Sequence, residues 1–131
     1  MIKAEFKYSE ITFLIIRCAM KVHCELKNGF QEVIYQRALE IEFKKLDLAY
    51  AREYEIPVFY MGEQIGTRRV DFLVNGIIST EIKAVSELED RHVAQALNYL
   101  EAMNLEIGML INFGEKSLTY RRLTNNKFQE V

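Results

Sequence analysis

Asp71, Glu81 and Lys83, in the middle of the chain, combine residue types that can cleave a phosphodiester bond. Two nearby carboxylates can hold Mg²⁺ or Mn²⁺, because these hard cations take oxygen ligands and keep waters that can be activated. A lysine beside them can orient or deprotonate the attacking water, or offset the negative charge that builds up at phosphorus. These residue types therefore predict a metal-dependent site acting on phosphodiesters.

Strand periodicity tests whether the three side chains can meet. In the β-like run 77–85, alternation places Glu81 and Lys83 on the same face. In the run 69–74, the same rule separates two faces, one with Arg69, Asp71 and Leu73 and the other with Val70, Phe72 and Val74. The relative position of Asp71 then depends on how the two strands are joined.

Asn75-Gly76 between the two runs indicates a β-hairpin. A plain two-residue loop would place Asp71 and Glu81 on opposite faces of the sheet. A three-residue connection with Gly76 in the left-handed region, forming a G1 bulge, would bring them to the same face. We predict the bulged connection, and a clean type I′ turn would contradict the metal site.

The motif alone also fits a simpler interpretation. An acid on one strand and a Glu-x-Lys pair on the next can be solvated charges that form a weak cross-strand pair. Such short patterns are common in unrelated sequences. The rest of the chain decides between the two interpretations.

Composition predicts one domain over residues 1–131. Half of the 131 residues are hydrophobic, with one proline and no tryptophan, and no linker or repeat is visible. The start of the chain lacks a signal-peptide pattern, and the apolar stretch 11–20 is too short and too interrupted to span a bilayer. We expect a cytoplasmic protein without a membrane partner, in which Cys18 and Cys24 stay reduced.

The net charge of −2 argues against a strongly basic, non-specific nucleic-acid binder. Basic pairs occur locally, at Arg68-Arg69, Lys44-Lys45 and Arg121-Arg122. Such pairs can contact phosphates, although many serve only solubility, which we favour for Lys44-Lys45.

Hydrophobic periodicity predicts the element order ααβββαββ and an α/β fold with a mixed sheet flanked by helices. Ser9 is the expected N-cap of the first helix, and Ser86-x-x-Glu89 is a capping-box pattern for the third. The predicted helices span residues 9–26, 30–46 and 86–103. The predicted strands span residues 54–60, 65–74, 77–85, 107–113 and 117–123.

Glu32 is an anomaly in the second predicted helix. It falls within an apolar stripe formed by Tyr35, Leu39, Phe43 and Leu46. The opposite face is also apolar, which predicts a helix packed on two sides, so a buried Glu32 would need a cation, a donor or a metal. Alternatively, Glu32 is a first-turn glutamate that complements the helix dipole; the helix alone leaves both options open.

The third predicted helix places His92, Gln95 and Tyr99 on one face, directly after Lys83 in the chain. Gln95 and Tyr99 could hold a phosphate, a base edge or a water at the metal. They also fit a half-buried helix face on which Tyr99 packs, and for His92 we favour a solvated, non-catalytic position.

Several motifs, in order, resemble the GxxExxY family of small bacterial proteins, which is assigned to the PD-(D/E)XK nuclease superfamily. The similarity covers nearly the whole chain. It rests on Val22-His23, Gly29-Phe30-Gln31-Glu32-Val33-Ile34-Tyr35, Ala38-Leu39, Ile56-Pro57-Val58, Asp71-Phe72-Leu73-Val74, Glu81-Ile82-Lys83-Ala84-Val85, Gln95-Ala96-Leu97-Asn98-Tyr99 and Gly108-Met109-Leu110-Ile111-Asn112-Phe113-Gly114.

The resemblance implies a restriction-endonuclease-like core with Glu32, Asp71 and Glu81 as metal ligands and Lys83 as the motif lysine. Gln95 and Tyr99 are similar to the Q-x3-Y element of RecB-type exonucleases. The literal Pro-Asp is absent, because Val70 precedes Asp71. His23 is a secondary candidate that could instead pack or bond to the loop at Asn28-Gly29.

We therefore expect a Mg²⁺- or Mn²⁺-dependent nuclease, with DNA favoured over RNA by analogy only. The competing hypothesis is a nuclease-fold module that binds nucleic acid or a protein partner without cutting, or that serves a larger complex. The acidic composition and the missing basic stripe favour the module that does not cut. The presence of Glu32, Asp71, Glu81 and Lys83 together favours catalysis. The oligomeric state is left open, with a homodimer as one option.

Overall fold

The computed structural model describes residues 7–130. Three helices and five strands follow one another in the predicted order ααβββαββ. Their bounds are α1 Ser9–Leu26, α2 Glu32–Lys45, β1 Tyr50–Tyr60, β2 Glu63–Val74, β3 Ile78–Lys83, α3 Asp90–Met103, β4 Ile107–Asn112 and β5 Thr119–Thr124.

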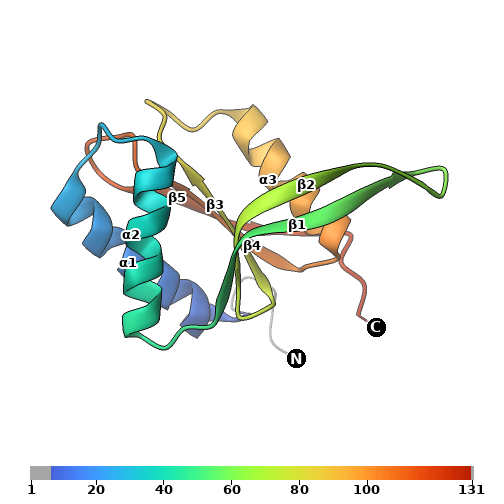
Figure 1. The fold of residues 1–131 in the computed structure, drawn as a ribbon, viewed down its shortest axis with the longest axis horizontal. Coiled ribbons are helices and arrows are strands. Elements are labelled where there is room, and N and C mark those ends of the chain that lie inside the picture. The colour runs from blue at the N-terminus through green and yellow to red at the C-terminus, as the bar shows by residue number, and fades with distance from the viewer. Residues whose placement is uncertain (1–6, 131) are drawn as a thin grey trace.

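The five strands form one mixed sheet in the order β1-β2-β3-β4-β5, with β3 and β4 parallel and the other neighbours antiparallel. Helices α1 and α2 cover one face of the sheet, and α3, the crossover between β3 and β4, lies on the other (Figure 1). The predicted α/β fold with a helix-flanked mixed sheet is confirmed. None of the described helices is long and apolar enough to cross a membrane.

Burial explains the pattern of each layer. All six residues of β4 are buried, which fits its continuous apolar sequence and its cover of helices on both sides. Tyr35, Leu39 and Phe43 of α2 are fully buried against the sheet, as the stripe predicted. The prediction of a second packed face on α2 is wrong, because Ile34 and Ile41 are 37% and 57% exposed.

The β2–β3 connection has the predicted parity. Val74 pairs with Ile78, which leaves three residues in the loop and sets Asp71 level with Glu81. Asn75 and Gly76 both have positive φ, 54° and 69°, as in a type I′ turn. Ile77 is the extra loop residue, and it follows the turn. The strands therefore keep the register of a bulged hairpin, although the bend itself has the φ values of a type I′ turn.

Strict alternation fails in β2. Val70 packs with Ile56 and Tyr99 on the α3 side, and Leu73 packs against the same cluster. Phe72, in between, belongs to the α1/α2 core. The side chains change sides where Glu53 of β1, opposite this point, adopts φ 53°, a conformation that no regular strand residue has. The faces predicted for residues 69–74 are therefore confirmed for Phe72, Leu73 and Val74 and wrong for Val70.

Several predicted boundaries also shift. Ser9 is the first residue of α1 and Tyr8 is its N-cap, without a side-chain cap bond. Helix α3 starts at Asp90 because the capping box is formed by Glu89 and His92, not by the Ser86 pattern. Strand β1 starts four residues before its predicted start, at Tyr50.

The loop between α1 and α2 is fixed by aromatic contacts and hydrogen bonds. The Tyr35 hydroxyl donates to the Lys27 carbonyl at 2.5 Å, and the Tyr35 ring stacks on Phe113 with centroids 4.6 Å apart. His23 is buried and its Nε2 lies 2.9 Å from the Glu115 carbonyl oxygen. His23 therefore braces the loop after β4, not the loop at Asn28-Gly29.

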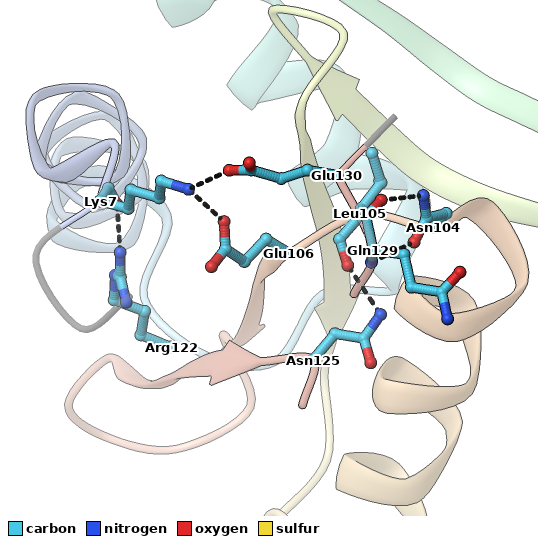
Figure 2. Close-up of polar contacts among 8 residues, drawn as sticks. All are labelled: Lys7, Asn104, Leu105, Glu106, Arg122, Asn125, Gln129 and Glu130. Carbon is cyan, nitrogen blue, oxygen red and sulfur yellow. Dashed lines mark hydrogen bonds and ion pairs between the residues drawn. The ribbon is translucent and has the colours of Figure 1, made fainter. Parts of the chain in front are cut away.

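Polar contacts tie both ends of the described chain to the body (Figure 2). Lys7 forms ion pairs with Glu106 at 2.8 Å and with Glu130 at 3.7 Å. Asn104 and Gln129 exchange two hydrogen bonds, at 2.8 and 3.0 Å, between the end of α3 and the C-terminal segment. These contacts join a residue before α1, the α3–β4 connection and the C-terminal segment.

Gly114 approaches the β3 end so closely that no side chain fits. A Cβ there would lie 2.2 Å from the Val85 carbonyl oxygen, which is backbone and cannot rotate away. We expect Gly114→Ala to lower the free energy of unfolding by about 1–3 kcal/mol through overpacking. Urea unfolding followed by circular dichroism measures this.

The matched control is Gly66→Ala, where a Cβ would meet nothing within 4 Å. It should change stability little. Equal stabilities for the two variants would contradict the packing of Gly114 against β3.

Candidate active site

All six residues predicted for the site line one cavity of about 270 Å³. Glu32 comes from the start of α2, Asp71 from β2, Glu81 and Lys83 from β3, and Gln95 and Tyr99 from α3. Arg68, Arg69 and His92 also line it, together with Ala96 and Leu110. The fold thus brings together side chains that are up to 67 residues apart in the chain.

Asp71 lies where β2 leaves β3. Regular pairing between these strands ends at Phe72 and Thr80, and the Ile82 amide donates instead to Asp71 Oδ2 at 2.7 Å. The other carboxylate oxygen, Oδ1, accepts a hydrogen bond of 3.0 Å from Gln36 Nε2. Two fixed donors from the β3 backbone and α2 therefore orient this carboxylate.

Sequence reasoning missed Gln36. Its side chain is buried, and its Oε1 has no hydrogen-bond partner in the structure. The available signal was spacing, because Gln36 lies four residues after Glu32 and so on the same helix face. Gln36 extends the polar face of α2 from the cavity to Asp71.

Glu81 is the most perturbed acid of the site. Burial, and then the neighbouring Asp71 carboxylate, raise the pKa of Glu81 to about 9. Its Oε1 is buried and forms no hydrogen bond with any of the described residues. Near neutral pH, without a bound cation, Glu81 therefore keeps its proton and can donate it in a hydrogen bond to Asp71.

The rest of the site modifies this acid pair. Burial raises the pKa of Asp71 above its usual value, while the Ile82 amide, Glu81, Lys83 and Gln36 all act to lower it. Lys83 shares a strand face with Glu81, as predicted, and its positive charge also lowers the pKa of Glu81. Lys83 thus favours the ionised form of both acids.

Arg68 is fixed in the cavity by α3. Its guanidinium lies over the Tyr99 ring, 4.2 Å from the centroid, and it donates to the Gln95 carbonyl oxygen at 3.1 Å and to Asn98 Oδ1. Burial, and then the charge of Glu81, raise the pKa of Tyr99 to about 12, so its phenol stays neutral. A planar cation held in this way suits a phosphate oxygen.

Two predicted positions need correction. Glu32 lines the cavity but is exposed, so the expectation that it points into the apolar stripe is wrong. The reason is its place as the first residue of α2, before the helix meets the sheet. His92, expected to be solvated, is buried: its Nδ1 accepts a 2.9 Å hydrogen bond from the Glu89 amide.

The donor set suits a hard cation. Asp71 and Glu81 are interacting carboxylates, and the unpartnered Glu81 Oε1 is the kind of atom that a cation would satisfy. Within residues 7–130, no three His, Cys, Asp or Glu side chains stand together as a complete ligand set. The residues therefore fit a site with two protein carboxylates, which leaves other positions to water or substrate.

A family profile described as the PD-(D/E)XK nuclease superfamily matches residues 9–123, which include every residue of the cavity. The chain belongs to the PD-(D/E)XK nuclease superfamily. The match spans all eight elements up to β5 and includes the Asp71 and Glu81-x-Lys83 strands.

A solved structure described as "Crystal structure of SSO0001" shares the fold, with a TM-score of 0.56 and 20% sequence identity. The alignment covers 70% of this chain and 48% of the solved one, so this chain spans about half the length of the solved protein. A comparison with curated proteins finds no match.

The proton on Glu81 predicts a pH-dependent stability. The ordinary pKa of a glutamate is 4.5, so between this value and about 9 the folded state binds a proton that the unfolded state releases. In EDTA, we expect the free energy of unfolding to fall as pH rises through this window, by at most about 1.4 kcal/mol per pH unit. Urea titrations from pH 5 to 9 measure the slope.

Glu81→Gln should flatten this slope and stabilise the metal-free protein above neutral pH. Glu63→Gln, at the exposed end of the β1–β2 hairpin, is the matched control and should keep the wild-type slope. If Glu81→Gln kept the slope as well, Glu81 would not be the group that binds the proton.

Proposed function

We propose that this protein is a metal-dependent nuclease that hydrolyses phosphodiester bonds of nucleic acid, with DNA as the favoured substrate. The observation that carries the proposal is the half-buried Asp71–Glu81 pair beside Lys83, with one buried Glu81 oxygen that has no hydrogen-bond partner among the described residues. Membership of the nuclease superfamily supports it. Within that superfamily, we place the chain with the GxxExxY proteins on the motif around Gly29, Glu32 and Tyr35.

Mg²⁺ or Mn²⁺ would be held by Asp71 and Glu81, with Glu32 lining the same cavity as the third acid. When bound, such an ion lowers the pKa of water and polarises a phosphoryl oxygen. Glu81 must lose its proton to become a ligand, so cation binding and proton release are coupled. Gln36 and the Ile82 amide keep Asp71 oriented while this happens.

In the proposed reaction, water attacks phosphorus and the bond to the leaving oxygen breaks. Lys83, on the same face as Glu81, orients the attacking water and accepts its proton, or offsets the negative charge that builds up at phosphorus. Arg68, fixed over Tyr99, offsets the negative charge on the non-bridging phosphate oxygens. Gln95 and the neutral Tyr99 hydroxyl line the cavity, where they can hold a phosphate or a base edge.

A second candidate function is nucleic-acid or partner binding without cleavage. The observation that favours it is the incomplete ligand set of the described residues, with Glu32 exposed. The net charge of −2 points the same way. Against it stands the cost of keeping two carboxylates and a lysine together in a buried site that has no ion to bind.

The proposed function predicts cleavage that depends on both metal and Lys83. Labelled single-stranded, double-stranded and flapped DNA, together with RNA, are incubated with Mg²⁺, Mn²⁺ or EDTA, and the products are separated on a gel. We expect Lys83→Ala to slow cleavage at least about 100-fold, because the loss of a positioned proton-transfer group has an effect of this size.

Lys116→Ala removes an exposed lysine in the β4–β5 loop and should cut like the wild type. Asp71→Asn should abolish cleavage with either metal. Cleavage that persists in EDTA, or that survives Lys83→Ala, would contradict the proposal, and no cleavage by the wild type would favour the binding module.

A further inference from the structure

The outer part of the β1–β2 hairpin extends beyond the rest of the sheet. β2 pairs with β3 only along residues 72–74, whereas its pairing with β1 continues to Tyr60 and Glu63. Figure 1 shows residues 54–70, which we call the arm, projecting past α3 to a turn at Met61-Gly62. Among residues 7–130, no other strand or helix covers its distal half, where residues 59–66 are exposed.

The end of the arm is apolar. Phe59, Tyr60, Met61 and Ile65 are 60, 66, 84 and 66% exposed. Glu63 is the only charged residue between positions 59 and 67. Large apolar side chains gathered on a projecting turn are typical of a contact surface, because they add no core to their own hairpin.

The root of the arm is fixed to the cavity. Ile56 and Val70 pack with Tyr99 of α3, and Arg68 lies on the same ring while bonding to Asn98. Whatever the tip contacts is therefore held at a set distance from the acid pair.

The arm is poorly suited to pairing with a strand of a second chain. β1 is an edge strand, but Pro57 within it has no amide proton to donate. The β1–β2 register also shifts between Val58 and Phe59, which twists the edge. Both features discourage strand addition, so the apolar side chains themselves must make the contact.

Arg68 is the cation between tip and cavity that favours nucleic acid. Arg68 and Arg69 follow the tip along β2 and both line the cavity, but Arg69 is paired with Glu53 and Glu55 of β1, at 3.9 and 3.8 Å. Arg68 contacts neutral groups of α3, so its charge would meet the phosphates of a strand that runs from the acid pair toward the tip.

Phe59 and Tyr60 pair with Gln64 and Glu63, which lie seven and eight residues from Asp71. This separation is about 23–26 Å along a strand, which corresponds to roughly seven or eight nucleotides of a stacked nucleic-acid strand.

We propose that the tip of the arm stacks on unpaired bases, roughly seven or eight nucleotides from the phosphodiester in the cavity. The inference rests on the proposed function and names its substrate class, which is nucleic acid with a single-stranded segment. Phe59 and Tyr60 supply rings that stack on any base, and Met61 and Ile65 supply the apolar edge that separates neighbouring bases.

Binding measured in EDTA tests the inference separately from cleavage. Fluorescence anisotropy of the full chain compares a labelled single strand of about 20 nucleotides with a blunt duplex of the same length. We expect Phe59→Ala and Tyr60→Ala each to weaken single-strand binding about fivefold or more, and duplex binding at most about twofold.

Phe13→Ala on α1 is the matched control, because Phe13 is 62% exposed and lies away from the arm. It should leave both affinities unchanged, and Phe59→Trp should keep single-strand affinity. If both arm variants bind the single strand as tightly as the wild type does, the inference is overturned and the proposed function stands. If the wild type binds no nucleic acid, the inference and the proposed function are both overturned. Self-association lost in Phe59→Ala, with unchanged DNA affinity, would also overturn the inference.

Discussion

The structure depends on the point where β2 separates from β3. An amide left without a strand partner in the interior is costly, and Ile82 avoids this by donating to the Asp71 carboxylate. The same bond holds Asp71 next to Glu81 in a largely buried position, where the two acids compete for one proton. The proximity of the two acids thus follows from the Ile82 amide, which has no β2 backbone partner and bonds to Asp71 instead.

Most of the motif residues outside the cavity serve to place the ones inside it. Tyr35 closes the α1–α2 loop onto Phe113, and the Asn112 side chain bonds both backbone groups of Val85 just after the Lys83 strand. These contacts fix the start of α2, and with it Glu32, relative to β3. Part of the sequence motif that suggests catalysis, such as Tyr35 and Asn112, therefore positions the site without lining the cavity.

Local rules predicted the elements and the core of the site, because the helix period, the strand period and hairpin parity are set by neighbouring residues. The three-residue connection after Val74 sufficed to place Asp71 level with Glu81. What local rules missed depends on contacts distant in the sequence. The exposure of Glu32 depends on where α2 meets the sheet, and the break in alternation between Val70 and Phe72 lies opposite Glu53 of the neighbouring strand. The role of Gln36 emerged only once α2 lay beside Asp71.

In the proposed metal site, a divalent cation displaces the Glu81 proton when it binds at the acid pair. Calorimetric titration of Mn²⁺ near pH 7.5, in two buffers with different ionisation enthalpies, counts the protons released per ion bound. We expect about one proton per ion in the wild type, and Glu81→Gln should lose both this release and most of the affinity. Tight binding without proton release, or equal binding by Glu81→Gln, would contradict it.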